Sequence, residues 1–126
     1  MYKKVTLNSE ISKVLSDLGH GDSIVIGDCG LPVPAGVKKI DISLKQGVPS
    51  FKDTYEVIKE SMHIERQIYA EEVKEKALLH TLENDIPAEK VTHEEFKELT
   101  KGAKAVIRTG ETTPYANVIL VSNVFF

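Results

Sequence analysis

The side chains of this chain best suited to moving a proton near neutral pH are its four histidines, and His20 has the most suggestive setting. His20 stands between two glycines, directly after a segment predicted to be a helix. A histidine just past a helix C-terminus meets the negative end of the helix dipole, which favours the protonated ring. His20 is therefore a candidate proton donor, and the alternative is a histidine that only caps the helix.

A second histidine, His93, falls in the first turn of another predicted helix, which Thr92 and Glu95 open as a capping-box pair. The positive end of that helix disfavours an imidazolium, so we expect a neutral ring that acts through hydrogen bonds. Lys97 lies one turn later on the same side of the helix. The alternative for this pair is a solvated helix face.

Two loops carry further groups that could bind a ligand. Asp28 follows an apolar strand, where open α/β sheets tend to bind ligands, and it could orient an imidazole or accept hydrogen bonds from hydroxyl groups. It could equally hold the loop that follows through backbone amides. Tyr115 and Asn117 supply a phenol and an amide suited to a polyhydroxylated ligand, or else they serve local packing. For Cys29 we expect a small buried residue and no chemical role.

Alternating helical and strand patterns must position these groups. Helices are predicted from the cap at Asn8 or Ser9 to Gly19, from Ser50 to Met62, over 71–84, and from Thr92 to Gly102. Strands are predicted over 23–27, 39–43, 64–70, 105–108 and 117–121, with a brief extended segment at 90–91. This order predicts an α/β fold: a single compact domain, residues 1–126, with a mixed, partly parallel sheet flanked by helices.

Composition excludes several functional classes. The 126 residues include 16 basic and 19 acidic side chains, for a formal net charge of −3, so no general nucleic-acid-binding surface is expected. The longest apolar run, 118–121, is too short to span a membrane. The chain lacks a phosphate loop, a dinucleotide fingerprint, a nucleophile elbow and a histidine pair at metal-ligand spacing. With one cysteine and no possible internal disulfide, we expect a cytoplasmic protein.

Several segments, in order along nearly the whole chain, resemble the D-ribose pyranase family. They are Asn8-Ser9-Glu10, Leu18-Gly19-His20-Gly21-Asp22, Asp28-Cys29-Gly30-Leu31-Pro32, Gly47-Val48-Pro49-Ser50-Phe51, His93-Glu94-Glu95-Phe96-Lys97, Arg108-Thr109-Gly110-Glu111 and Pro114-Tyr115-Ala116-Asn117-Val118-Ile119-Leu120.

The resemblance implies a specific activity. Members of that family interconvert the pyranose and furanose forms of D-ribose without metal or cofactor, and they supply the ring form that ribokinase uses. It implies that His20 is the proton donor and that the sugar is bound by Asp28, His93, Lys97 and the run Tyr115, Ala116 and Asn117. It also implies a homopentamer or homodecamer with sugar sites between subunits.

Three other functions stay open at this point. The related L-fucose mutarotases share the fold, so the chain could be a mutarotase of another sugar. A non-catalytic sugar-binding accessory protein of ribose uptake would use the same hydroxyl-binding residues, but His20 would be replaceable. A structural ring protein would bind no sugar at all.

Overall fold

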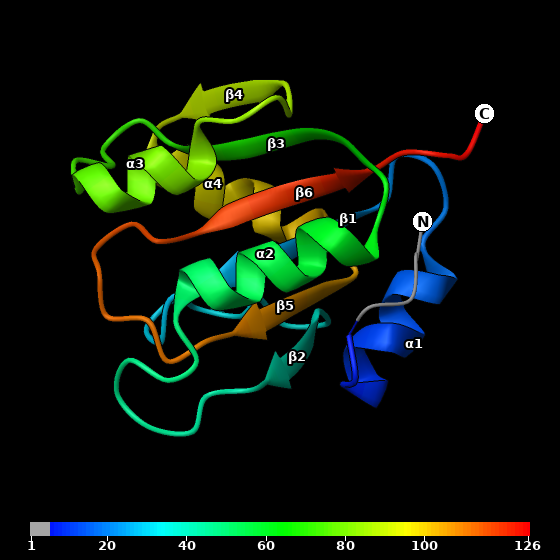
Figure 1. Ribbon diagram of the computed structural model, residues 1–126, viewed down its shortest axis with the longest axis horizontal. Coiled ribbons are helices and arrows are strands. Elements are labelled where there is room, and N and C mark those ends of the chain that lie inside the picture. The colour runs from blue at the N-terminus through cyan, green and yellow to red at the C-terminus, as the bar shows by residue number, and fades with distance from the viewer. Residues whose placement is uncertain (1–5) are drawn as a thin grey trace.

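The structure, a computed structural model, describes residues 6–126 and contains one six-stranded sheet with helices on both faces (Figure 1). The elements in chain order are α1 (Ser9–Asp17), β1 (Ser23–Gly27), β2 (Lys38–Asp41), α2 (Phe51–Ser61), β3 (Ile64–Ala70), α3 (Lys76–Leu82), β4 (Ala88–Val91), α4 (His93–Leu99), the 3₁₀ turn η1 (Thr100–Gly102), β5 (Ala105–Arg108) and β6 (Val118–Ser122). The predicted α/β class, with a mixed, partly parallel sheet, is confirmed.

The sheet has the strand order β2-β5-β1-β6-β3-β4. β1 and β2 run parallel to β5, β3 runs parallel to β4, and β6 is antiparallel to both β1 and β3. β6 therefore joins two parallel blocks, and its N-terminal end lies at the same sheet edge as the carboxyl ends of the other five strands. Any ligand site at that edge draws on loops from both blocks.

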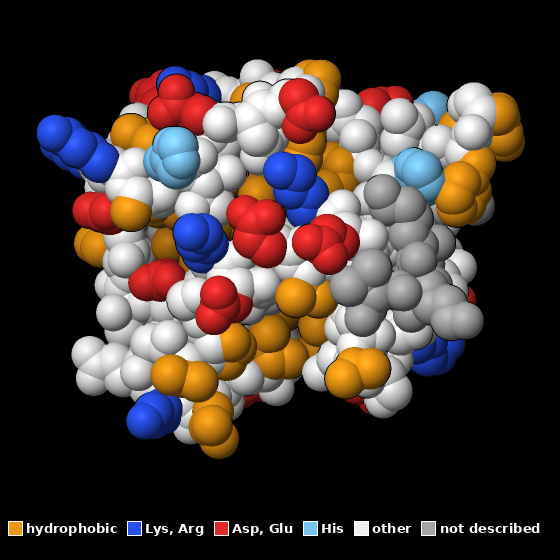
Figure 2. All heavy atoms as spheres, viewed as in Figure 1, with side chains coloured by type: hydrophobic (Ala, Val, Ile, Leu, Met, Phe, Trp, Pro, Cys, Tyr) orange, Lys and Arg blue, Asp and Glu red, His pale blue; other side chains and the backbone are white. Residues whose placement is uncertain are grey.

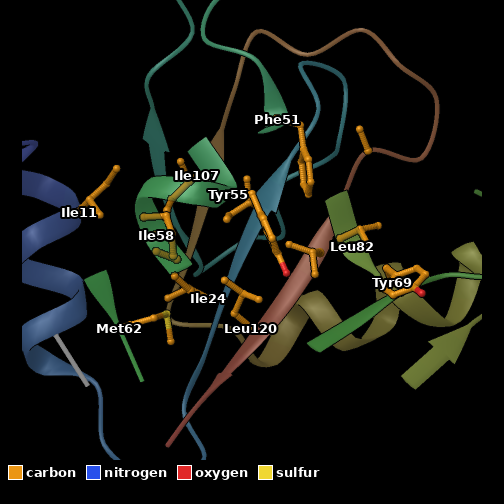
Figure 3. Close-up of a cluster of buried hydrophobic side chains, with 14 of the residues drawn as sticks. Ile11, Ile24, Phe51, Tyr55, Ile58, Met62, Tyr69, Leu82, Ile107 and Leu120 are labelled. Atoms are coloured by element: carbon orange, nitrogen blue, oxygen red, sulfur yellow. The ribbon is translucent and has the colours of Figure 1, made fainter. Parts of the chain in front are cut away.

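Alternating strand residues separate two apolar layers, because successive side chains of a strand point to opposite faces. On one face, α2 packs Phe51, Tyr55 and Ile58 against strand residues such as Ile24 and Leu120 (Figure 3). The neighbouring residues of the same strands point to the other face. There Val25 and Ile119 pack with Phe96 of α4 and with Leu31. Figure 1 shows α2 in front of the sheet and α4 behind it.

The helix predicted over 71–84 is shorter in the structure, where α3 begins at Lys76. The backbone N–H of Glu71 instead donates to the carbonyl of Val91, which continues the pairing of β3 with β4, and Val73 turns back onto Ala70. The Glu75 side chain then caps α3 by accepting from the N–H of Ala77 at 2.9 Å. The hydrophobic spacing of residues 71–84 did not reveal that Glu71 pairs with the end of β4 and that the helix begins only at Lys76.

Other boundaries differ by smaller amounts. The strand predicted to reach residue 43 ends at Asp41, because the Asp41 carboxylate turns back to accept from Ser43 N–H at 3.0 Å. The helix predicted to end at Gly102 finishes as α helix at Leu99 and continues as the turn η1. β6 begins one residue later than predicted because the N–H of Asn117 bonds the carbonyl of Tyr115. Strands β1, β3 and β5 have the predicted bounds.

Candidate functional site

The carboxyl-end edge of the sheet gathers most of the predicted sugar-binding residues. Asp28 follows β1, His93 follows β4, and Asn117 directly precedes β6, which enters the sheet from this edge. The turn before β6 also carries Tyr115 and the fully buried Ala116. Topology, rather than nearness in sequence, brings these residues to one side of the molecule.

Asn117 is the most deeply placed polar group of this edge, with 1% of the residue exposed. Its Oδ1 atom accepts a hydrogen bond from the backbone N–H of Asp28 at 2.8 Å. Its amide nitrogen, Nδ2, is buried and has no hydrogen-bond partner among the residues that the structure describes. An unpaired buried donor costs stability, so this atom marks a place where a ligand acceptor fits.

Asp28 can both hold its own loop and accept a hydrogen bond from a hydroxyl group, which are two of the roles suggested by the sequence. Its Oδ1 atom accepts from the backbone N–H of Gly30 at 2.9 Å, which is the loop-holding role. The residue remains partly exposed, so a carboxylate oxygen is also available to a hydroxyl group. Gly27 lets the loop after β1 and the turn before β6 approach its backbone closely. A Cβ at Gly27 would lie 2.8 Å from Leu31 Cδ2 and 3.4 Å from Asn117 Oδ1.

His93 is partly buried rather than lying on a fully solvated helix face. Its backbone N–H donates to both carboxylate oxygens of Glu72, at 2.9 and 3.1 Å. Its ring meets the ring of Tyr115 edge-on, with centroids 5.1 Å apart and planes 74° apart. The ring atom Nδ1 is buried and has no partner within residues 6–126. His93 therefore offers a second unused polar atom at the edge that holds Asn117.

Tyr115 has a left-handed backbone, with φ of +64°, a conformation that is uncommon for a bulky residue and is found at functional sites. A surface hollow beside it is lined by Glu72, Lys74, Glu75 and Pro114. The Lys97 ammonium pairs with Glu94 at 2.9 Å. The pairing with Lys97 lowers the pKa of the Glu94 carboxyl.

Glu111 holds the β5–β6 loop, residues 109–117, in its shape. Its carboxylate accepts from the backbone N–H of Phe51 at 2.9 Å, which ties this loop to the first turn of α2, and from the Thr113 hydroxyl at 2.8 Å. Burial raises the pKa of the Glu111 carboxyl, but the bonds from Phe51, Thr113 and the Thr112 N–H outweigh burial and lower it overall. No role for Glu111 was predicted from the sequence.

Arg108 braces the loop that starts at Asp28. Its Nε donates to the carbonyl of Cys29 at 3.0 Å, while one terminal nitrogen donates to Asp41 Oδ2 and Ser43 Oγ, each at 2.9 Å. Cys29, expected to be buried, is only partly so, because its backbone lies in this surface network. The Ser43 hydroxyl and N–H, and then Arg108, hold the pKa of the Asp41 carboxyl at about 2.

His20 lies at the opposite edge of the sheet. It sits in the turn before β1, whereas Asp28 follows β1, and the four steps from Ser23 to Gly27 alone span about 13 Å at ~3.3 Å per residue. Within one chain, Asp28 therefore does not orient His20. The ring Nε2 instead lies 2.7 Å from Glu65 Oε1.

None of the helices within residues 6–126 has both the length and the hydropathy needed to cross a membrane. Within the same range, no three or more His, Cys, Asp or Glu side chains come together as a metal-binding group would require.

Comparison with known proteins adds relatives that match the chain from end to end. It is 59% identical to the D-ribose pyranase of Staphylococcus haemolyticus and 56% identical to that of Bacillus subtilis, each over 100% of both chains. The structure of Bacillus subtilis RbsD complexed with D-ribose superposes with a TM-score of 0.95 at 55% identity, covering 100% of both chains.

A fucose mutarotase from Streptococcus pneumoniae, solved in complex with L-fucose, shares the fold, with a TM-score of 0.75 at 24% identity over 95% of each chain. The model of the RbsD / FucU transport protein family matches residues 1–125. The chain therefore belongs to the RbsD/FucU family.

Proposed function

We propose that this chain is a D-ribose pyranase, an intramolecular isomerase that interconverts β-D-ribopyranose and β-D-ribofuranose. The observation that carries the proposal is the end-to-end identity of 49–59% to D-ribose pyranases. The unused polar atoms of His93 and Asn117 support a polyhydroxylated ligand at the edge where they lie, because hydroxyl groups both donate and accept hydrogen bonds. In this proposal residues 1–126 form one domain.

The reaction needs one proton removed and one proton added. Ring opening takes the proton from the anomeric hydroxyl and gives a proton to the ring oxygen, which leaves an open-chain aldehyde. After rotation, the C4 hydroxyl attacks the aldehyde in place of the C5 hydroxyl, and proton transfer in the reverse sense completes the furanose. Atoms and electrons balance without an oxidant, and a positioned acid–base group supplies an acceleration of about 10²–10⁴-fold.

In this proposal His20 is the proton donor and shuttle. Asp28, His93, Tyr115, Asn117 and the Ala116 backbone hold the sugar hydroxyls, and Lys97 is a further contact. The separation of His20 from the other residues supports a site shared by two subunits, in which His20 reaches across to the Asn117 edge of its neighbour. A closed homo-oligomeric ring, a pentamer or a stacked decamer, gives every subunit such a neighbour.

The neighbouring metabolic step follows from the product. The furanose form is the substrate that a ribose-phosphorylating kinase such as ribokinase would consume, and we propose a cytoplasmic location beside that enzyme.

Exchange between ribose ring forms, followed by NMR, tests the activity. The wild-type protein should accelerate pyranose–furanose exchange, and His20→Ala should abolish the acceleration while D-ribose still binds. His80→Ala is the matched control, because His80 is an exposed histidine of α3 and should keep the full rate. Binding without acceleration in the wild type would favour the accessory-protein function, and no saturable binding would favour a structural ring protein. L-Fucose in place of D-ribose tests sugar specificity.

A mixing experiment tests the shared site. His20→Ala and Asn117→Ala subunits, each inactive alone, should regain activity when co-expressed. Random assembly leaves roughly a quarter of the interfaces with both residues intact. A mixture that stays inactive would contradict a site between subunits.

A further inference from the structure

We infer that Glu65 is the positioning residue of His20: its carboxylate holds Nε2–H, so that Nδ1 is the ring atom that exchanges the proton with the sugar. This inference rests on the proposed function and assigns a residue and an atom to it.

The turn that carries His20 is fixed by its backbone. Asp22 Oδ2 accepts from the N–H of Gly19 at 2.9 Å, and Gly21 adopts a φ of +88° and donates to the carbonyl of Ser122 at 3.0 Å. Ser122 N–H in turn donates to the carbonyl of Asp22 at 2.7 Å. The Cα position of His20 is therefore set, but 55% of its side chain is exposed and the ring is free to rotate unless another side chain holds it.

A β-bulge brings Glu65 to this ring. The pairing of β3 with β6 shifts by one residue, from Ile64 opposite Ser122 to Arg66 opposite Val121, so Glu65 is the extra residue. A regular strand would point Glu65 to the same face as the buried Gln67, whereas a bulge breaks the alternation and re-aims a side chain. Because Ser122 is paired with Ile64 on one side and with the His20 turn on the other, the bulge lies next to His20.

The contact that results specifies the tautomer of the ring. Glu65 Oε1 lies 2.7 Å from His20 Nε2, and an ionised carboxylate only accepts hydrogen bonds, so Nε2 carries the proton. In the neutral ring, Nδ1 then holds the lone pair that takes the proton from the anomeric hydroxyl. When the ring becomes an imidazolium, the adjacent carboxylate stabilises its charge.

The same contact adds little to the stability of the fold. The side chains of His20 and Glu65 are 55% and 40% exposed, and exposed ion pairs contribute little to the free energy of unfolding. A purely structural role therefore predicts at most a small fall in melting temperature and no selective effect on turnover. A positioning role predicts a loss of kcat with an unchanged KM.

The test compares Glu65→Ala and Glu65→Gln with the wild-type oligomer. We expect Glu65→Ala to lower kcat for ribose exchange about 10- to 100-fold, part of the acid–base contribution, with KM within about twofold. Glu65→Gln keeps an acceptor oxygen but no charge, so its loss should be smaller. Glu89→Gln is the matched control, because it removes another exposed carboxylate, which is paired with Arg66 at 3.2 Å, and should leave kcat unchanged.

Heteronuclear NMR of the His20 ring gives a readout that does not depend on catalysis. In the wild type the Nε2–H proton should resonate downfield and exchange slowly, and in Glu65→Ala that signal should move upfield or exchange rapidly. Unchanged ring signals, or an unchanged kcat in both Glu65 variants, would overturn the inference. A wild type that accelerates no exchange would refute the proposed function instead, while the ring signals would still decide the Glu65 contact.

Discussion

Asn117 Oδ1 accepts a hydrogen bond from the backbone N–H of Asp28 at 2.8 Å. This bond directly joins two proposed sugar-binding residues that are 89 positions apart in sequence. The bond uses the acceptor end of the amide and fixes its orientation. The donor end, Nδ2, is thereby directed away from Asp28 and is left without a partner among the described residues. One side chain holds the first loop in place and offers its remaining hydrogens to a ligand.

Asn117→Asp separates these two functions. An aspartate keeps an acceptor for the Asp28 N–H but has no hydrogens to donate, so the fold should persist while D-ribose binding weakens about 10-fold or more. Calorimetric titration measures the affinity, and a thermal melt checks the fold. Gln46→Glu makes the same amide-to-carboxylate change on an exposed loop and should bind normally. Undiminished affinity in Asn117→Asp would show that Nδ2 does not contact the sugar.

Glu111→Gln tests the anchor of the β5–β6 loop. The pKa of Glu111 is lower in the folded chain than its ordinary value of 4.5, so the carboxylate stabilises the fold fully above about pH 4.5. That contribution decreases as the pH falls through the folded pKa. Urea unfolding across this range should show a weaker pH dependence for Glu111→Gln than for the wild type. Two parallel stability curves would contradict the assignment.

Gly110→Ala should destabilise the fold, by about 1–3 kcal/mol as for other overpacked sites. A Cβ at Gly110 would lie 2.5 Å from the carbonyl oxygens of Lys45 and Val48, and backbone atoms cannot rotate away as a side chain can. Gly110 also bonds Gly47 and Pro49 through its own backbone, so the contact cannot open freely. Chemical denaturation measures the loss. Gly102→Ala, where a Cβ meets nothing within 4 Å, is the control and should cost less.

Asp41 should stay ionised in the folded protein down to about pH 2, compared with an ordinary value of 3.8. Because the folded pKa is the lower one, its stabilising effect is present above about pH 3.8 and is lost as the pH falls through about 2. Carboxyl-carbon NMR gives the pKa directly. Ser43→Ala should raise it, since Ser43 supplies the largest lowering contribution. An unshifted titration in that variant would refute this cause.

Residues whose surroundings are local could be predicted from the sequence. The β-branched run before Asp28 gave the bounds of β1 correctly, and Thr92 accepts from the N–H of Glu95 at 3.1 Å, as the capping signature predicts. The positions of Asp28 and His93 at the ends of elements followed from those signals. Roles that depend on which edge of the sheet an element reaches stayed predictions.

Contacts between distant segments could not be predicted in this way. Glu65 bonds His20 across 45 positions, and it does so through a bulge that the sequence pattern of residues 64–70 does not indicate. Glu111 bonds Phe51 across 60 positions, through a loop whose composition showed only that it was irregular. The sequence also left open whether Asp28 orients an imidazole, because pairing order, which the sequence does not show, decides at which ends of the strands Asp28 and His20 lie.

The central place of β6 has a consequence for how the chain reaches its native state. The two parallel blocks, β2-β5-β1 and β3-β4, share no hydrogen bonds with each other except through this strand. Because β6 follows the other five strands in sequence, protein synthesis completes both blocks before the strand between them exists. Pairings such as Ile24 with Leu120 close very long loops, which slows folding. Until β6 has paired, β1 and β3 each have an unpaired side that is prone to aggregation. The insertion of β6 between β1 and β3 is therefore the step that protects both blocks at once.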